Sequence, residues 1–181
     1  IENPSLNASD HVWWSGSGDY LDNTLTREFN LTEVESATFN ITSWYDIEDG
    51  YDYGYVEVYN SETGSWDTLL TLTGTGQGVS TIDLTPYCGE VIDLCLLYET
   101  DGSVAWYGWY VDEMAIPEIG YYDDAEDDGE WIPYGWSRIT EEYPVYFSVT
   151  TCYADNGTSL SSQAVNRIVE DGTVFVTSAG N

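Results

Sequence analysis

Residues 36–60, SATFNITSWYDIEDGYDYGYVEVYN, decide the fold. Apolar and polar residues alternate on both sides of Asp49-Gly50. The apolar members share one parity in each run: Ala37, Phe39 and Ile41, then Val56 and Val58. Alternation with a period of two is typical of strands with one buried face, and an Asp-Gly pair favours a turn. The stretch therefore predicts two β-strands, at about 36–46 and 53–60, joined by a turn.

The same pattern extends over the first two thirds of the chain. Further strands are expected at about 11–15, 24–29, 66–72, 79–84, 89–98, 104–117 and 131–139. Val91 to Tyr98 is almost continuously apolar, which predicts a strand buried on both faces. The glycine-rich stretch 74–78 predicts a turn, and the acidic stretch 121–128 predicts an exposed loop. Many short strands with frequent turns predict a mostly β fold, a β-sandwich or jelly roll, over residues 1–140.

The pattern changes after residue 140. Val145–Val149 and Thr173–Val176 are apolar runs, and between them Ser159–Asp171 carries apolar residues at helical spacing. Strand, helix and strand in this order form a βαβ unit, which requires a parallel sheet. One such unit cannot form a core alone. We therefore expect residues 141–181 to be an incomplete α/β segment, and both ends of the chain to be cuts through a longer protein.

The charge of the chain is extreme. The sequence has 33 acidic residues against 3 arginines, no lysine, and a formal net charge of -30. Nucleic acid is excluded as a partner because nothing would neutralise its phosphates. Membrane insertion is not expected, since no apolar run approaches the roughly 18 residues of a span. Two interpretations remain: the acids hold cations, chiefly Ca²⁺, or they keep the protein hydrated in a salty setting.

Some of the acidic residues are candidate calcium ligands. Three lie on one predicted strand and its turn, and five come from separate segments that a jelly roll can gather: Asp46, Glu48 and Asp52, then Asp19, Asp22, Asp101, Asp112 and Glu113. Oxygen ligands from several strands around one ion would cross-link the sandwich. A solvated acidic face is the alternative interpretation.

Catalytic signals are weak in this sequence. His11 is the single histidine, and no serine has the context of an activated nucleophile. The carboxylate pairs Asp46/Glu48 and Asp112/Glu113 suit glycosidase chemistry in principle, but such pairs arise by chance in so acidic a chain.

Cysteine and tryptophan leave further alternatives open. Cys88 and Cys95 either pair or remain buried free thiols, and Cys152 makes the number of cysteines odd. Seven tryptophans suit either a sugar-stacking platform or core packing: Trp13, Trp14, Trp44, Trp106, Trp109, Trp131 and Trp136.

Residues 1–140 contain stretches that carry a family resemblance: Trp14–Leu25, Trp44–Glu48, Tyr51–Val58, Gly64–Trp66, Tyr98–Asp101 and Gly108–Glu113. In order and spacing they resemble the MAM-like β-sandwich of immune inhibitor A-type secreted metallopeptidases and other exoproteins. The resemblance implies an accessory domain at an extracellular or cell-surface location. The His-Glu-x-x-His zinc motif of those metallopeptidases is absent from the sequence, so we expect no zinc peptidase here.

Residues 143–181 resemble a different family. Ser159–Asn181 is similar to the helix and strand that lead to the oxyanion-hole asparagine of subtilisin-like serine peptidases. The resemblance implies that Asn181 donates its amide to the tetrahedral oxyanion. The stretch 148–152 matches their substrate-cleft strand in position but departs from its usual Ser-Leu-Gly.

Together the two resemblances imply a fragment of a secreted subtilisin-like serine endopeptidase that carries an inserted MAM-like accessory sandwich. Its partner would be a protein or peptide substrate of the parent peptidase. The chain alone would lack the catalytic triad and be inactive. The alternative is a non-catalytic extracellular module for adhesion or for carbohydrate or protein binding.

Overall fold

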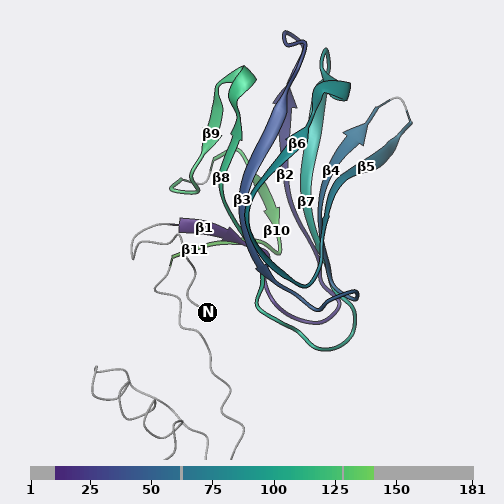
Figure 1. The fold of residues 1–181 in the computed structure, drawn as a ribbon, viewed down its shortest axis with the longest axis vertical. Coiled ribbons are helices and arrows are strands. Elements are labelled where there is room, and N and C mark those ends of the chain that lie inside the picture. Colours follow the sequence, from purple (N-terminus) through teal and green to yellow (C-terminus); the bar gives the residue numbers. More distant parts are fainter. Residues whose placement is uncertain (1–10, 62, 128, 141–181) are drawn as a thin grey trace, which may run out of the picture. The chain divides into compact units, whose positions relative to one another are not determined.

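The computed structural model describes residues 11–61, 63–127 and 129–140. Within them, eleven strands form two antiparallel sheets that pack as a β-sandwich (Figure 1). One sheet has the order β11-β1-β8-β3-β6, with β9 also paired to β8, and the other has the order β10-β2-β7-β4-β5. The predicted mostly β architecture is confirmed. The strand–helix–strand segment predicted for residues 141–181 lies outside the described residues and stays a prediction.

The strands are β1 (His11–Trp14), β2 (Asp22–Asn30), β3 (Thr38–Asp46), β4 (Tyr53–Asn60), β5 (Ser65–Leu72), β6 (Thr75–Asp83), β7 (Val91–Glu99), β8 (Gly108–Ile116), β9 (Tyr121–Asp123), β10 (Ile132–Tyr134) and β11 (Ser137–Thr140). The described residues also contain two short 3-10 helices, η1 (Thr85–Tyr87) and η2 (Pro117–Ile119). Among the described residues, no helix is long and apolar enough to cross a bilayer.

The core lies between the two sheets and follows the alternation of the sequence. Phe39 and Ile41 of β3 face Val56 and Val58 of β4 from the opposite sheet, and all four side chains are fully buried. Their polar neighbours in sequence face outward, as the period of two requires. Because β3 and β4 belong to different sheets, the turn between them carries the chain from one layer to the other.

Trp109, near the start of β8, is a large side chain of this core. Its side chain is fully buried, and its indole Nε1 donates to the Ser43 Oγ at 3.0 Å. The ring meets Trp136 edge to face, with centroids 5.4 Å apart. On its other side the ring lies against Gly54 of β4, where an added Cβ would come within 2.9 Å of a ring carbon. Gly54 therefore allows the two sheets to approach closely around the indole.

The glycine-rich stretch 74–78 is a turn only at its start: Gly74 lies in the bend that joins β5 to β6, whereas residues 75–78 belong to a strand. β6 begins at Thr75 and pairs with β3 through both Gly76 and Gly78. The phenol ring of Tyr45 occupies the space where a Cβ of Gly76 would stand. The glycines serve a close approach of side chain to backbone inside a strand, a role that composition does not distinguish from a turn.

The acidic stretch after β8 is only partly an exposed loop, and the prediction is corrected there. Tyr121 to Asp123 form β9, which pairs with the end of β8. The Arg27 guanidinium lies 4.5 Å from the Tyr121 ring centroid, and it donates to Glu130 at 2.8 Å. A half-buried arginine on β2 thus anchors this acidic segment to the sandwich.

Two other predicted strand boundaries and one predicted burial pattern are wrong. The single strand predicted at 131–139 is two strands in different sheets, because Gly135 takes a positive φ of 75° between them. The strand predicted from residue 104 begins at Gly108. β7 is buried mainly on one face, since Val91 is 49% exposed and Asp93 is also exposed.

Two of the three cysteines lie in the described part of the chain. Cys88 and Cys95 are both free thiols there, and burial raises the pKa of Cys95 to about 11. A buried thiol with a raised pKa holds little thiolate at neutral pH and reacts slowly.

The contact between Gly54 and Trp109 leads to a test of the core. Gly54→Ala should lower the free energy of unfolding by about 1–3 kcal/mol, because the new methyl group must displace a packed ring. Urea unfolding measures the loss. In the Trp109→Phe background the smaller ring should relieve part of the strain, so the two losses should not add. Fully additive losses would contradict this packing.

Candidate functional site

Several loops converge at one end of the sandwich. The end of β3 at Asp46 pairs with the start of β6 at Thr75 and the start of β8 at Gly108. In the other sheet, the end of β7 at Glu99 pairs with the start of β4 at Tyr53. Strand pairing therefore places the connections 47–52, 73–74 and 100–107 together, at the lower end of the sandwich in Figure 1.

Three carboxylates from two of these connections form a compact group, which we call the acid cluster. Glu48, Asp52 and Asp101 each place an oxygen within 4.8 Å of the others. The backbone fixes this arrangement: the Asp101 N–H donates to Asp52 Oδ1 at 3.0 Å, and the Asp52 N–H donates to the Glu48 carbonyl at 3.0 Å. The Tyr20 N–H donates to the Asp101 carbonyl at 2.7 Å and ties a third segment to the cluster.

The acid cluster is short of positive charge and of hydrogen-bond donors. Asp52 is 1% exposed, and its Oδ2 is buried without a hydrogen-bond partner, as is Oε2 of Glu48. Burial, together with the negative charges of Asp101 and Asp52, raises the pKa of Glu48. Burial is also the largest cause that raises the pKa of Asp52, against the lowering by backbone N–H donors. Buried carboxylate oxygens without donors are costly unless a cation reaches them.

A divalent cation with a preference for oxygen fits this group. Ca²⁺ takes six to eight oxygen ligands, mostly carboxylates, carbonyls and water. Three carboxylates supply part of that number, so water or backbone carbonyls would have to complete it. The two unpartnered oxygens are the observation that favours a cation over a merely solvated acidic face.

The structure brings together three of the eight predicted calcium ligands and leaves five outside the cluster. Asp46 is buried but accepts a hydrogen bond from Thr75 Oγ1 at 2.7 Å. Asp19 is exposed, and its negative charge contributes to the raised pKa of Asp52. Asp22 is exposed on β2 opposite Glu99.

The remaining two predicted ligands lie on β8. Asp112 is paired with Thr42 of β3, and its Oδ1 accepts from the Glu113 backbone N–H at 2.7 Å. The Glu113 carboxylate accepts from Thr42 Oγ1 at 3.1 Å. Both belong to the irregular part of the β3–β8 pairing, and neither is a member of the acid cluster.

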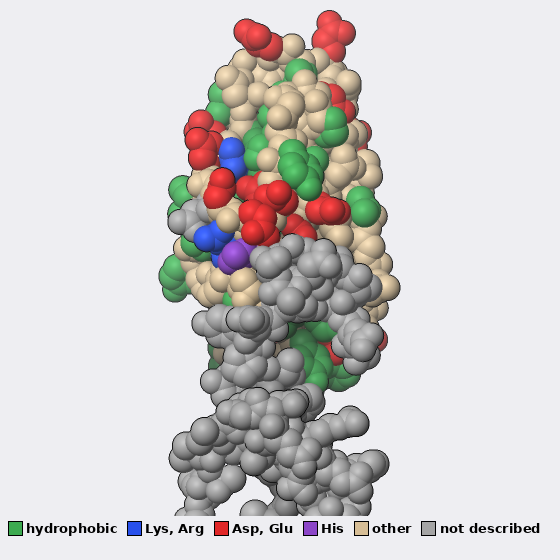
Figure 2. All heavy atoms as spheres, turned by 90° about the vertical axis from the view of Figure 1, so that its left-hand side faces the viewer, with side chains coloured by type: hydrophobic (Ala, Val, Ile, Leu, Met, Phe, Trp, Pro, Cys, Tyr) green, Lys and Arg blue, Asp and Glu red, His purple; other side chains and the backbone are tan. Residues whose placement is uncertain are grey.

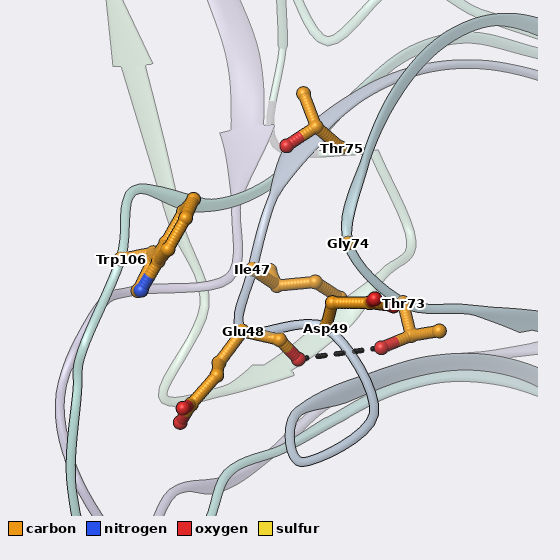
Figure 3. A pocket seen from close by; sticks show the side chains of 7 residues that line it. All are labelled: Ile47, Glu48, Asp49, Thr73, Gly74, Thr75 and Trp106. Atoms are coloured by element: carbon orange, nitrogen blue, oxygen red, sulfur yellow. Dashed lines mark hydrogen bonds between the residues drawn. The ribbon is translucent and has the colours of Figure 1, made fainter.

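A shallow pocket of about 600 Å³ adjoins the acid cluster. Its lining comes from the same connections: Ile47, Glu48, Asp49, Thr73, Gly74, Thr75 and Trp106 (Figure 3). We call it the Trp106 pocket. The sequence analysis proposed other roles for Glu48 and Trp106 and did not predict that they line one pocket. Their loops come together only through the pairing of β3 with β6 and β8, which the sequence pattern does not specify.

The predicted sugar-stacking platform of seven tryptophans does not exist as one surface in the described structure. Four of the seven are core residues that are at most 5% exposed: Trp13, Trp109, Trp131 and Trp136. Trp14 and Trp44 are half-buried on the outer face of one sheet, and Trp106 is 43% exposed.

Charged side chains on the face shown in Figure 2 are mostly acidic, and some of them lie beside the few basic side chains. His11 belongs to this region: its Nδ1 lies 3.1 Å from Glu126 Oε2, and its backbone N–H donates to Glu126 Oε1 at 2.7 Å. These contacts, led by the backbone hydrogen bond, lower the pKa of Glu126. His11 thus joins β1 to the acidic loop.

Comparison with known proteins finds a family match for the first part of the sandwich. Residues 3–82 match the sequence model of a family described as "Immune inhibitor A-like, MAM domain". The match covers β1 to β5 and most of β6. It confirms the resemblance inferred from the aromatic and acidic stretches of this part of the chain.

Three relatives are similar over part of their length. The "Pre-pro-metalloprotease PrtV" of Vibrio cholerae serotype O1 is 26% identical over 141 residues, which is 70% of this chain and 15% of that protein. "Bacillopeptidase F" of Bacillus subtilis is 32% identical over 85 residues, 46% of this chain and 6% of that protein. "Immune inhibitor A" of Bacillus thuringiensis subsp. alesti is 31% identical over 130 residues, 63% of this chain and 19% of that protein. The chain thus spans less than a fifth of each of these proteins.

The acid cluster predicts that Glu48→Gln has opposite effects on the melting temperature without calcium and with calcium. Because the pKa of Glu48 is raised by folding, its stabilising contribution is present below its unfolded pKa and is lost as the pH rises through its folded pKa. In chelator at pH 7, Glu48→Gln should therefore raise the melting temperature, and the gain should disappear below about pH 4. With Ca²⁺ present, the same substitution should lower it.

The unsubstituted chain should melt roughly 5–10 °C higher than in chelator when the calcium concentration exceeds the dissociation constant a hundredfold. Asp93→Asn removes an exposed carboxylate of β7 and is the control, with the full calcium shift retained. A calcium shift that is equal in Glu48→Gln and the parent chain would rule out the acid cluster as the site.

Proposed function

We propose that the sandwich is a non-catalytic accessory module of a secreted peptidase. The observation that carries the proposal is the combination of the domain match over residues 3–82 with relatives that are named as peptidases. Each relative shares only a small part of its length with this chain, so the shared part is a module within a larger protein. The strongly acidic, lysine-free composition supports an extracellular setting.

The placement of the chemistry-bearing side chains supports a non-catalytic role. His11, the single histidine of the sequence, is held by Glu126 in a contact that joins two segments of the fold. Asp46/Glu48 and Asp112/Glu113 were the carboxylate pairs that glycosidase chemistry would need. Asp46 is bound to Thr75 and Glu113 to Thr42, so each pair has a member engaged in holding strands or loops together.

Calcium would serve this module as a structural cross-link. Glu48, Asp52 and Asp101 would hold it, and the ion would neutralise carboxylates that the fold has buried without donors. Binding to the folded chain alone would stabilise the loops 47–52 and 100–107 by mass action. Resistance to unfolding is a useful property for a module that is exposed to peptidases, since cleavage acts on opened chains.

The finer proposal concerns the parent protein. The resemblance of Ser159–Asn181 to subtilisin-like serine peptidases supports a serine endopeptidase in which Asn181 belongs to the oxyanion hole. Its substrate would be a protein or peptide. This proposal depends on residues outside the described part of the chain, and it is independent of the accessory role of the sandwich.

The accessory role predicts that the 181-residue chain has no peptidase activity of its own. Incubation with labelled casein and with a fluorophosphonate probe should give neither cleavage nor labelling, with or without calcium, because His11, the single histidine of the sequence, is engaged by Glu126 and not by a nucleophile among the described residues. Subtilisin in the same buffer provides the positive control. Calcium-dependent casein cleavage or a labelled serine would contradict the proposal.

The sequence of the gene on both sides of this chain tests the proposed parent peptidase separately from the accessory role of the sandwich. A subtilisin-like parent should encode Asp and His-Gly-Thr motifs before Ile1 and a Gly-Thr-Ser-Met-type motif after Asn181, which sequencing of the flanks reveals. A His-Glu-x-x-His motif there would reject the serine peptidase and keep the accessory role. Flanks without any peptidase motif would reject both.

A further inference from the structure

We propose that the Trp106 pocket binds a lysine or arginine side chain of another polypeptide. Figure 3 shows Trp106 on one side of the pocket, facing the turn 47–49 and the segment 73–75 across the opening. One exposed aromatic ring and two carboxylates therefore border the same open space. The inference does not require the peptidase role, because it depends on the pocket alone.

The polar groups of the lining favour a ligand that donates hydrogen bonds. Thr73 Oγ1 accepts from the Gly50 N–H at 2.7 Å and donates to the Glu48 carbonyl at 3.3 Å. Thr75 Oγ1 donates to Asp46 Oδ1 at 2.7 Å. Both hydroxyl hydrogens are therefore used within the protein. The carboxylates of the lining only accept, and a lysine ammonium or an arginine guanidinium only donates.

Trp106 supplies the second element of recognition. Its side chain is 43% exposed, and its indole borders the pocket. A cation over an indole face is attracted by the ring quadrupole, and the aliphatic stem of lysine or arginine packs on the same surface. Asp49 is exposed and lies outside the acid cluster, so its carboxylate stays available when a metal ion binds Glu48.

The charge balance of the chain favours an occupant from another kind of molecule. The sequence has no lysine. Of its three arginines, Arg27 is engaged by Glu130 and Asp123, Arg138 donates to the Ala125 carbonyl at 3.2 Å, and Arg167 lies outside the described residues. A second copy would also carry a net charge of -30 and be repelled. A basic polypeptide, in contrast, would be steered toward this surface by its charge.

Neighbouring aromatic rings favour a polypeptide over a free amine. Successive ring contacts connect Trp14 to Tyr110, Tyr110 to Trp44 and Trp44 to Tyr107, with centroids 6.1, 5.0 and 6.4 Å apart. This aromatic row crosses β1, β8 and β3 and ends at the residue next to Trp106. It offers apolar contact area for residues that flank the bound cation.

Two short peptides test the proposal on the 181-residue chain in 1 mM CaCl₂. The first is acetyl-Gly-Phe-Lys-Phe-Gly-amide, and the second carries norleucine in place of lysine. Isothermal titration should show the lysine peptide binding about tenfold more tightly than the norleucine peptide, with an affinity that falls as NaCl is added. Trp106→Ala should weaken the lysine peptide by about tenfold.

Trp66→Ala is the matched control. Trp66 is also 43% exposed, but it lies on β5, packs against Tyr59 and is not part of the pocket lining. This variant should bind the lysine peptide as the parent chain does. Asp49→Asn changes an exposed residue, so it should fold normally, and it should weaken the lysine peptide several-fold while leaving the norleucine peptide unchanged.

Three results would overturn the proposal. Equal binding of the two peptides would show that the surface recognises apolar residues without the cation. Equal losses in Trp106→Ala and Trp66→Ala would place binding outside the pocket. Binding of cellohexaose that depends on Trp106, with no binding of the lysine peptide, would assign the pocket to a neutral carbohydrate.

Discussion

Asp52 is buried with one carboxylate oxygen that no donor in the described structure reaches, and the loop end of the sandwich depends on this constraint. Its other oxygen holds the Asp101 backbone, and its own N–H reaches the Glu48 carbonyl. The same hydrogen bonds that order the two loops therefore force three carboxylates together. A cation would relieve this repulsion and would make the order of the loops conditional on metal binding.

The packing of the core also holds residues in place at this end of the sandwich. Trp109 sits between the sheets against Gly54, and its backbone N–H donates to Ser15 Oγ at 2.9 Å. The loop 100–107 lies between Asp101, in the acid cluster, and the start of β8, in the core. Trp106 is therefore fixed from both ends of its loop. The position of the pocket that Trp106 borders therefore depends on the pairing of β8 at one end of the loop and on the hydrogen bonds of Asp101 at the other.

Much of the fold could be predicted from the sequence, because alternation reports which face of a strand is buried. Residues 36–60 gave β3, β4 and the turn between them correctly within two residues. The errors have physical causes. Gly76 pairs with Tyr45 in the β3–β6 ladder, where the Tyr45 ring occupies the space of a Cβ, and residues 131–139 divide at Gly135 because the chain changes sheets there. Neither cause is visible without the tertiary partner.

The candidate site was predicted only in part for a similar reason. Glu48 and Asp52 lie close in the sequence, and their proximity could be inferred from one turn. Asp101 joins them because β4 and β7 are neighbours, a pairing that the sequence pattern does not specify. The Trp106 pocket was missed entirely, since it needs three connections from both sheets. Composition indicated cation binding in general but did not distinguish the three carboxylates of the acid cluster from thirty others.

Direct titration of calcium tests the central claim that the fold has built one cation site at Glu48, Asp52 and Asp101. Isothermal titration of the chain with CaCl₂ in 1 M NaCl suppresses diffuse binding to the acidic surface. The account predicts one saturable site per chain, which disappears in Asp52→Asn while the control Asp93→Asn retains it. Gradual uptake without saturation, or an unchanged site in Asp52→Asn, would contradict the account.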